Sequence, residues 1–195
     1  MVSGPSGAGK GTLIRGVLEQ APALAVAVSC TTRAKRPGEI DGREYHFMSR
    51  AEFARLVDQN AFLEHAEFAG NRYGTLGSEL DRILVGGRSV ILEIELQGAR
   101  NVRALRPDSI SIFIAPPSLE ELGRRLRERA TDADEEIAER LEVARGEMGA
   151  EAEFDHRILN DDASRATHEL VEIIRSATAC PVLERHGDAR GRNWR

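Results

Sequence analysis

A glycine-rich segment near the N-terminus constrains the fold of this chain more than any other feature. Residues 4–12 read Gly-Pro-Ser-Gly-Ala-Gly-Lys-Gly-Thr, and apolar residues with helical spacing follow from Leu13 to Leu18. Glycines let successive backbone N–H groups turn toward an anion, and the positive end of the following helix lies at the same point. The segment therefore predicts a phosphate-binding loop, with Lys10 as a mobile charge for the β- and γ-phosphates of a nucleotide.

The loop departs from the usual phosphate-binding pattern at one position. Ser or Thr normally follows the lysine directly, whereas this chain has Gly11 and then Thr12, a variant that resembles nucleoside monophosphate kinases. We expect the Thr12 hydroxyl to organise the Mg²⁺ that accompanies ATP. The alternative is a glycine-rich turn without a ligand, which the register of the loop with its apolar helix disfavours. The predicted ATP-binding residues of this segment are Ser3, Gly4, Pro5, Ser6, Gly7, Ala8, Gly9, Lys10, Gly11 and Thr12.

The strand that should precede this loop is short in the sequence. A phosphate-binding loop is expected to follow a buried strand, yet only Met1, Val2 and Ser3 precede Gly4. Two explanations are open. Either the natural chain starts upstream, which we favour, or the sheet lacks most of this strand.

Short apolar strands alternate with amphipathic helices along the rest of the chain. The predicted strands are Ala23–Ser29, Ser89–Glu95, Ser109–Ile114 and, shorter, His156–Asn160. Their near-continuous apolar character suits strands that are covered on both faces, so we expect an α/β fold with a parallel sheet flanked by helices. Helix starts are predicted at Ser49 with Glu52, at Ser118 with Glu121, and at Ser164.

Two regions interrupt this alternation. The segments Arg43–Met48 and Phe62–Phe68 predict a separate small antiparallel patch, and the polar, acidic segment Ala130–Glu136 between two arginine-rich helices predicts a hinged lid. The end of the chain, from Ala179 to Arg195, has no periodicity and is expected to be a frayed tail.

Composition excludes several classes of function. The net charge of −5 does not favour non-specific binding to a nucleic-acid backbone, which needs clustered positive charge. No apolar run approaches the ~20 residues that span a bilayer, and no secretory pattern precedes the loop. We therefore expect a cytoplasmic protein without a nucleic-acid or membrane partner. Cys30 and Cys180 lack the spacing of metal ligands and are expected to be ordinary thiols.

Four further motifs carry a resemblance to a known family. They are Ser29-Cys30-Thr31-Thr32-Arg33-Ala34-Lys35-Arg36-Pro37-Gly38-Glu39, then Gly42-Arg43-Glu44-Tyr45-His46-Phe47, then Phe62-Leu63-Glu64-His65-Ala66-Glu67-Phe68 with Gly70-Asn71-Arg72-Tyr73-Gly74-Thr75, and Leu92-Glu93-Ile94-Glu95-Leu96-Gln97-Gly98. Together with the loop and Asn160-Asp161-Asp162, they resemble the bacterial guanylate kinase family in order and spacing over roughly residues 1–177.

This resemblance implies a P-loop nucleoside monophosphate kinase that transfers the γ-phosphoryl group of MgATP to GMP, and to dGMP, in purine nucleotide metabolism. It implies a domain at 1–177, with a core at 1–32 and 76–177, a GMP-binding subdomain at about 33–75 and a lid at about 125–140. Residues 178–195 would be a flexible tail. Oligomeric state does not follow from the sequence.

The family's GMP-binding residues match positions whose chemistry suits the task. Arg33 and Arg36 can bind a phosphate dianion bidentately, and the resemblance assigns Tyr45 and Tyr73 to the same phosphate. Guanine presents two adjacent donors, N1–H and the 2-amino group, which the carboxylate of Glu64 can accept together. The resemblance puts the hydroxyls of Ser29 and Thr75 near the base. Each residue alone would more often be an ordinary surface or strand residue, and only the joint register favours a site.

Two motifs depart from the family pattern. Glu93 and Glu95 stand where the family has Asp-x-Asp; we expect Glu93 to face the nucleotide, the alternative being that these carboxylates cap the helix that starts near Gln97. The lid has Ala130-Thr131-Asp132 after Arg129, where the family has Gly-Thr-Glu. Arg129 and Arg140, together with Lys10 and Arg33, are predicted to stabilise the transferred phosphoryl group. Arg125 is a weaker candidate for the same role. The alternative is that these lid arginines only form ion pairs on the helix surface. Asn160 is assigned to ATP by the same resemblance.

The expected mechanism is direct in-line transfer without a covalent enzyme intermediate. The acceptor phosphate is already largely ionised, so none of the five histidines is proposed as a base. Two other functions remain open. One is a kinase of the same fold with another phosphorylated acceptor, such as adenylate or a ribosyl phosphate, which Glu64, Ser29 and the pair Tyr45 and Tyr73 disfavour. The other is a non-catalytic binding module, which the intact Gly9-Lys10-Gly11-Thr12 disfavours.

Overall fold

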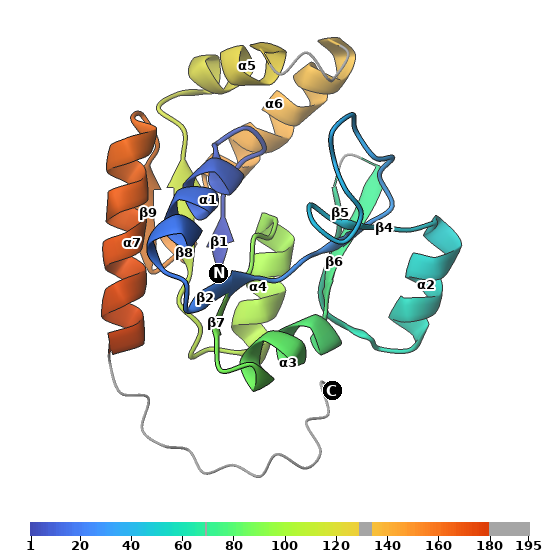
Figure 1. Cartoon of the computed structure of the whole chain (residues 1–195). Coiled ribbons are helices and arrows are strands. Elements are labelled where there is room, and N and C mark those ends of the chain that lie inside the picture. The colour runs from blue at the N-terminus through green and yellow to red at the C-terminus, as the bar shows by residue number, and fades with distance from the viewer. Residues whose placement is uncertain (69, 129–133, 180–195) are drawn as a thin grey trace.

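The computed structural model describes residues 1–68, 70–128 and 134–179 of the chain (Figure 1). The central strands are β1 (Val2–Ser3), β2 (Leu24–Val26), β7 (Ser89–Ile91), β8 (Ile112–Ala115) and β9 (His156–Leu159). A second sheet to one side contains β3 (Cys30–Thr31), β4 (His46–Phe47), β5 (Phe62–Phe68) and β6 (Asn71–Leu76). The helices are α1 (Lys10–Gln20), α2 (Arg50–Asp58), α3 (Gly77–Val85), α4 (Leu96–Leu105), α5 (Leu119–Glu128), α6 (Asp134–Met148) and α7 (Ala163–Ala179), with a 3₁₀ turn, η1, at Glu151–Glu153.

All pairings between the central strands are parallel, as the sequence predicted. Strand β8 pairs with β1 on one side and β9 on the other, and β2 pairs with β7. Val2 joins the two groups because its N–H donates to Leu92 O (2.8 Å) and its carbonyl accepts from Ile94 N (3.2 Å). The strands therefore follow the order β2-β7-β1-β8-β9 across the sheet.

Strand β1 is only two residues long, yet it has partners on both sides. The N-terminal ammonium of Met1 donates to Ile110 O (2.6 Å), and Ile112 N donates to Met1 O (2.9 Å). Val2 is 1% exposed. The loop at residues 4–12 therefore leaves the carboxyl end of a central, buried strand, which is where open α/β sheets bind ligands.

Helices cover both faces of the central sheet, because its strands are apolar on both sides. On one face, Leu13 and Val17 of α1 pack with Leu170 of α7 against the strands. On the other face, Ile83 of α3 and Val102 of α4 pack on residues from β2 and from the segment after β7. Among the described residues, no helix is both long and apolar enough to span a membrane.

Two of the predicted helix starts are confirmed and one is wrong. Ser49 and Glu52 form the predicted capping box of α2, and Ser118 Oγ accepts from Glu121 N (3.1 Å). Helix α7, however, begins at Ala163 rather than at Ser164. Asp162 takes the cap because its carboxylate accepts the Arg165 N–H at 2.8 Å, and Asp is at least as good a cap as Ser.

The second sheet contains the two predicted segments and more. Strands β5 and β6 are antiparallel, β6 is antiparallel to β3, and β4 joins β3 in parallel, giving the order β4-β3-β6-β5. Helix α2 covers this sheet, and its Phe53 stacks on Phe62 with ring centroids 4.4 Å apart. Cys30 lies in β3 as a buried free thiol. Residues 1–32 were predicted to belong to the core of the domain, but β3 belongs to the second sheet.

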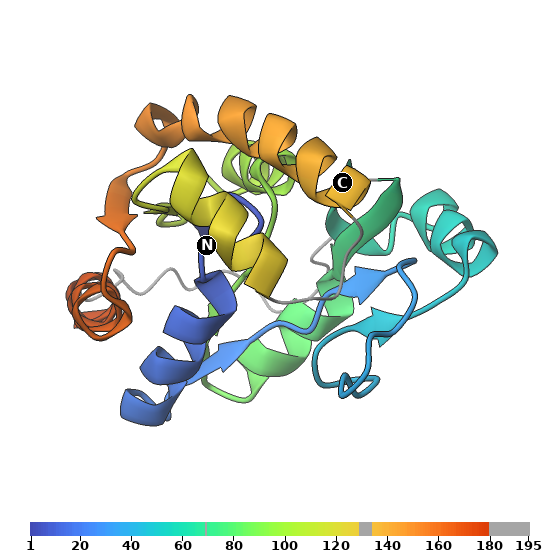
Figure 2. The same cartoon turned by 90° about the horizontal axis from the view of Figure 1, so that it is seen from above.

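Helices α5 and α6 lie together above the central sheet. Leu122 and Leu126 of α5 form a small core with Ile137 and Ala144 of α6. Seen from above, α6 extends from the α7 side of the molecule toward the second sheet (Figure 2). Residues 129–133 of the predicted lid lie outside the described residues. So do residues 180–195 of the predicted tail, whose first two positions, 178 and 179, belong to α7.

Candidate active site

One cavity of about 260 Å³ lies between the carboxyl end of the central sheet and the second sheet. Most of the predicted site residues line it: Pro5, Ser6, Gly7, Gly9, Lys10, Gly11, Thr12, Ser29, Arg33, Arg36, Tyr45, Glu64, Tyr73, Glu93 and Arg140. Ser3, Gly4, Ala8, Thr75 and Asn160 are buried behind this lining. Arg129 lies outside the described residues.

Glycines are required in the loop at residues 4–12. Gly4, Gly7 and Gly9 have φ values of 137°, 93° and 93°, which other residues rarely adopt. A Cβ atom on Gly4 would also lie 2.3 Å from the carbonyl oxygen of Ile114. Gly9 precedes α1, and no side chain of the described residues caps this helix there. The N–H groups of the first turn can therefore bind an anion.

Lys10 lies beneath this loop and is 7% exposed. Its ammonium donates to two carbonyls of the same loop, Gly4 O at 2.5 Å and Pro5 O at 3.3 Å. The side chain is thus folded back on the loop.

Asn160, which the family resemblance assigns to ATP, makes a contact with the loop. Its side chain is buried behind the loop, where Nδ2 donates to Ala8 O at 2.7 Å. Its own carbonyl accepts from Arg125 Nη2 at 3.0 Å, and Arg125 also pairs with Glu121 at 2.8 Å. Asn160 and Arg125 therefore brace the loop from behind, and neither lines the cavity.

Arg33 follows β3 and is held by a carboxylate to which sequence reasoning gave no role. Its Nη2 donates to Glu39 Oε1 at 2.7 Å, and the other oxygen of Glu39 accepts from Arg36 N at 2.7 Å. Burial opposes ionisation of Glu39, but these hydrogen bonds outweigh it and hold the pKa of the carboxyl below its ordinary value. The sequence feature that could have indicated this role is the position of Glu39, an acidic residue three positions after Arg36.

The two tyrosines lie beside this arginine. Tyr45 and Tyr73 meet edge to face with ring centroids 6.0 Å apart, and the Arg33 guanidinium carbon lies 5.5 Å from the centre of the Tyr45 ring. Burial, together with the charges of Glu93 and Glu95, raises the pKa of Tyr45 well above its ordinary value. Its phenol therefore stays protonated and can donate to an anion.

Glu64 is buried at the other end of the cavity, where it is 6% exposed. Thr75 Oγ1 donates to its Oε1 at 2.8 Å, and Ser29 Oγ lies 3.4 Å from the Thr75 hydroxyl. Burial raises the pKa of Glu64 to about 7; the hydrogen bonds with Thr75 oppose the rise, and the charge of Glu95 adds to it. These three side chains are the ones predicted to surround the base.

Two local features give the Glu64 carboxylate its position. The β5–β6 pairing shifts register between Phe62 and Glu64, and such an irregularity re-aims the side chain that follows it. Gly98 of α4 leaves room for the carboxylate, since a Cβ atom there would lie 2.4 Å from Glu64 Oε2. Sequence reasoning missed the role of Gly98, whose only signal was its place in the fourth motif.

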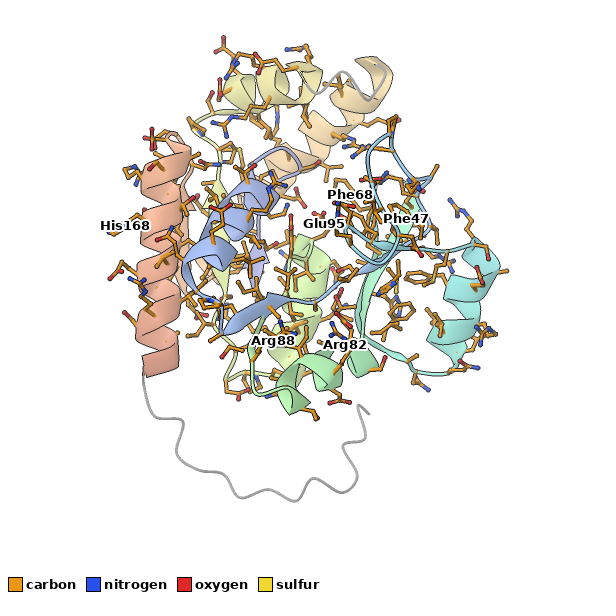
Figure 3. All side chains as sticks on the ribbon, viewed as in Figure 1. Phe47, Phe68, Arg82, Arg88, Glu95 and His168 are labelled. Carbon is orange, nitrogen blue, oxygen red and sulfur yellow. The ribbon has the colours of Figure 1, made fainter. Side chains whose placement is uncertain are left out.

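Glu93 and Glu95 follow β7 and line the cavity. Glu93 faces the loop, because a Cβ atom on Gly11 would lie 3.6 Å from its Oε2. Glu95 stands at the N-cap position of α4, but its side chain makes no capping hydrogen bond. The alternative that Glu95 caps this helix is therefore wrong. Figure 3 shows its side chain in the space between α1 and the second sheet, facing Phe68.

Helix α6 brings one arginine to the loop. Arg140 Nη1 lies 3.4 Å from Ser6 Oγ, and both residues line the cavity. Thr12 is exposed at the start of α1, and its hydroxyl accepts from Arg15 Nη2 at 3.3 Å. Within the described ranges, no cluster of three or more His, Cys, Asp or Glu residues could hold a metal ion.

Comparisons with known proteins identify the family of this chain. The sequence profile of the family described as "Guanylate kinase" matches residues 1–177. A guanylate kinase of Rubrobacter xylanophilus is 54% identical over 179 residues, which are 92% of this chain and 94% of that protein. One of Trichormus variabilis is 52% identical over 85% of this chain and 83% of its own length. The crystal structure of guanylate kinase from Anaplasma phagocytophilum, 35% identical, superposes with a TM-score of 0.75 over 90% of this chain and 82% of that chain. The chain therefore belongs to the guanylate kinase family.

Proposed function

We propose that this protein transfers the γ-phosphoryl group of ATP to GMP, and also to dGMP, giving ADP and the nucleoside diphosphate. One observation carries the proposal: the buried carboxylate of Glu64 shares a cavity with the P-loop lysine, Lys10, and with Arg33. In this proposal, one cavity would hold the carboxylate that binds the purine base, the arginine that binds the acceptor phosphate and the lysine that binds the donor phosphates. The relatives named above bear the corresponding enzyme name.

The donor half of the site would bind the ATP phosphates. The loop N–H groups and the start of α1 accept anionic oxygens, and Lys10 leaves the carbonyls of Gly4 and Pro5 to neutralise them. Arg140 approaches from α6, where its guanidinium already lies beside Ser6. We also assign Arg129 to the transferred phosphoryl group. Asn160 would take part in ATP binding next to Ala8, whose carbonyl accepts from its Nδ2.

The oxygen donors near Gly11 fit Mg²⁺ that enters as MgATP. Thr12 offers a hydroxyl at the start of α1, and Glu93 directs a carboxylate toward the same loop. Hard oxygen ligands that complete a phosphate-bound shell are the usual protein contribution to Mg²⁺. Thr12 would hold the ion, whose charge would offset that of the phosphates.

The acceptor half would bind GMP through its two ends. Arg33, Arg36, Tyr45 and Tyr73 would bind the phosphate, with Arg33 presented by Glu39. At the other end, the ionised carboxylate of Glu64 would accept both N1–H and the 2-amino group of guanine. Ser29 and Thr75 complete the base site through the hydroxyl contacts described above. Glu93 would contact the acceptor between the two ends.

The transfer itself needs positioning and charge neutralisation more than proton chemistry. A phosphate oxygen of GMP attacks the γ-phosphorus in line, and ADP leaves, so that no bond to the enzyme forms. Lys10, Arg33, Arg129 and Arg140 would offset the charge on the equatorial oxygens. We propose that residues of about 33–75 and the lid of about 125–140 close over the two nucleotides and exclude water. Purine nucleotide recycling in the cytoplasm is the physiological setting of such a reaction.

Release of ADP by the purified protein tests this proposal. The protein is given MgATP with GMP, dGMP, AMP, CMP or UMP separately, and ADP is measured by a coupled assay. We expect turnover with GMP and dGMP alone. Comparable turnover with AMP would contradict the assignment of Glu64, and nucleotide binding without turnover by the folded protein would favour a binding module instead.

A further inference from the structure

Glu147 is a buried carboxylate that the proposed transfer does not use. It lies one residue before the end of α6 and is 6% exposed. Its Oε2 is buried and has no hydrogen-bond partner among the residues that the structure describes. Leaving such an oxygen unsatisfied costs about 1–3 kcal/mol, so its surroundings call for an explanation in terms of function.

The charges of two groups, which come from two different elements, act on this carboxyl. Lys10 comes from the start of α1, and Glu95 comes from the start of α4. Burial raises the pKa of Glu147 to about 7; the charge of Glu95 adds to the rise, and the ammonium of Lys10 opposes it. The carboxyl can therefore exchange a proton near neutrality, in the field of the P-loop lysine.

The register of α6 directs Glu147 and Arg140 to the same region. They are seven residues apart, which is about two helical turns, so they lie on one face of the helix. Ala144 is fully buried on that face, and Arg140 contacts Ser6 of the loop. Helix α6 runs from the lid down behind the loop (Figure 1). It thus presents a cation and a carboxyl to the nucleotide-binding side of the molecule.

Lys10 can respond to this carboxyl because, among the described residues, only two of its N–H donors have an acceptor. An ammonium has three N–H donors. In this structure two of them bond to the loop carbonyls, Gly4 O and Pro5 O. Anionic phosphates above the loop would draw the ammonium away from these acceptors and from the field of Glu147.

We propose that Glu147 is a positioning residue for Lys10: it attracts the ammonium before a nucleotide binds and takes up a proton when nucleotide phosphates draw that ammonium away. The inference rests on the proposed function, since it requires the loop to bind the phosphates of ATP. The proton comes from the buffer and is returned when the product leaves. Movement of Lys10 is in this way linked to the protonation of Glu147, near the C-terminal end of α6.

The proposal has a defined sign. The Lys10 ammonium opposes protonation of Glu147, so the affinity of Glu147 for a proton rises when a nucleotide draws Lys10 away. Nucleotide binding and proton uptake therefore favour each other. Affinity for the nucleotide should therefore fall as the pH rises. If the proton affinity rises by about one pKa unit, the dissociation constant increases about fivefold between pH 6 and pH 8, relative to a protein without this group.

Titration calorimetry with the Mg²⁺ complex of the β,γ-imido analogue of ATP tests this link. The protein is titrated at pH 7 in two buffers of different ionisation enthalpy, which gives the number of protons exchanged per nucleotide. The variant Glu147→Gln keeps the shape and removes the titration. Its matched control is Glu142→Gln, on the same helix, where an exposed carboxylate lies 4.0 Å from Arg145.

We expect the wild type and Glu142→Gln to take up about 0.4 proton more per nucleotide than Glu147→Gln. Equal proton counts in all three proteins would overturn this inference while leaving ATP binding intact. Failure of the wild type to bind the analogue would refute the proposed function as well. If Glu147→Gln does not fold, a ¹³C titration of the Glu147 carboxyl in the wild type, with and without the analogue, decides the question: an unchanged pKa overturns the proposal.

Discussion

The hydroxyl of Thr75 donates a 2.8 Å hydrogen bond to Glu64 Oε1, and the other carboxylate oxygen faces Gly98 of α4. This pair comes from two adjacent antiparallel strands, β5 and β6, where Glu64 and Thr75 are direct partners in the register. The hydrogen bond uses one lone pair of Oε1, and a carboxylate has about four such sites. Acceptor capacity therefore remains for the two donors of guanine.

Replacement of Glu64 by Gln should reduce selectivity between the purines. The amide presents one acceptor and one donor, which opposes the two donors of guanine and matches the donor and acceptor edge of adenine. We expect the ratio of kcat/KM for GMP over AMP to fall by about 100-fold, since a hydrogen bond to a charged group contributes about 1.5–3 kcal/mol. Steady-state assays with both acceptors give this ratio.

The matched control for this change is Glu67→Gln on the same strand. The Glu67 carboxylate is exposed and lies 3.9 Å from Arg72. It does not line the cavity. Its removal should leave the GMP over AMP ratio within about twofold of the wild type. A ratio that is unchanged in Glu64→Gln would show that the base is recognised elsewhere.

The same carboxyl predicts a pH dependence for the use of GMP. Burial raises the pKa of Glu64 to about 7, and only the ionised form can accept from both donors of guanine without presenting an O–H. The kcat/KM for GMP should therefore rise with pH through about 7 and then level. Ionisation of the GMP phosphate contributes to the same profile, so the wild-type values are divided by those of Glu64→Gln. A flat quotient between pH 5.5 and pH 8.5 would contradict the prediction.

Glu64 should also make stability depend on pH. Its folded pKa lies above the ordinary value of 4.5, so its contribution to the free energy of unfolding is fully present below pH 4.5 and is lost as the pH rises through about 7. The loss amounts to about 3 kcal/mol. The free energy of unfolding of Glu64→Gln, relative to that of the wild type, should therefore increase by about this amount from pH 5 to pH 8. Urea unfolding of both proteins at the two pH values measures this difference.

Lys10 should be required for the transfer but not for the fold. Lys10→Met removes a buried charge and retains an unbranched chain, so we expect kcat to fall about 100- to 1000-fold while the melting temperature stays the same or rises. The sequence offers a control, because Lys35 is the second of its two lysines and is exposed between Arg33 and Arg36. Lys35→Met should keep nearly full activity. Near-normal turnover of Lys10→Met would refute the proposed mechanism.

Much of this site could be predicted from the sequence, because its parts are short segments whose spacing is itself the signal. The loop at residues 4–12 needs glycines at positions of positive φ, and Glu64 and Thr75 belong to one hairpin. Parallel pairing of the central strands followed from their apolar character on both sides. In each case, the cause lies within a few residues of the feature.

The parts that were missed depend on contacts between distant segments. Asn160 donates a hydrogen bond to Ala8, although 152 positions of the chain separate them. The charge of Lys10 acts on Glu147 only because α6 passes behind the loop. Gly98 matters only because Glu64 lies against α4. Local pattern carries no information about such neighbours. The start of α7 was misplaced for a smaller reason, since Asp162 and Ser164 are competing caps within one turn.

Glu39 should position Arg33 for the acceptor phosphate. Each carboxylate oxygen has its own donor, the Arg33 guanidinium and the Arg36 N–H, both at 2.7 Å. Glutamine can satisfy only one of them, because its second polar atom is itself a donor. Glu39→Gln should therefore loosen Arg33 and raise the KM for GMP by about five- to tenfold, with little change in kcat.

Glu44→Gln is the control for this last prediction, because it lies in the same loop with similar bonds. Its carboxylate accepts from Ile40 N and from Arg43 Nε, both at 2.7 Å, but it does not line the cavity. Its KM for GMP should match that of the wild type. A lower KM in Glu39→Gln would mean that repulsion between Glu39 and the phosphate outweighs the orientation of Arg33. Since the Arg33 side chain is 11% exposed and its guanidinium also lies over the Tyr45 ring, we expect orientation to dominate.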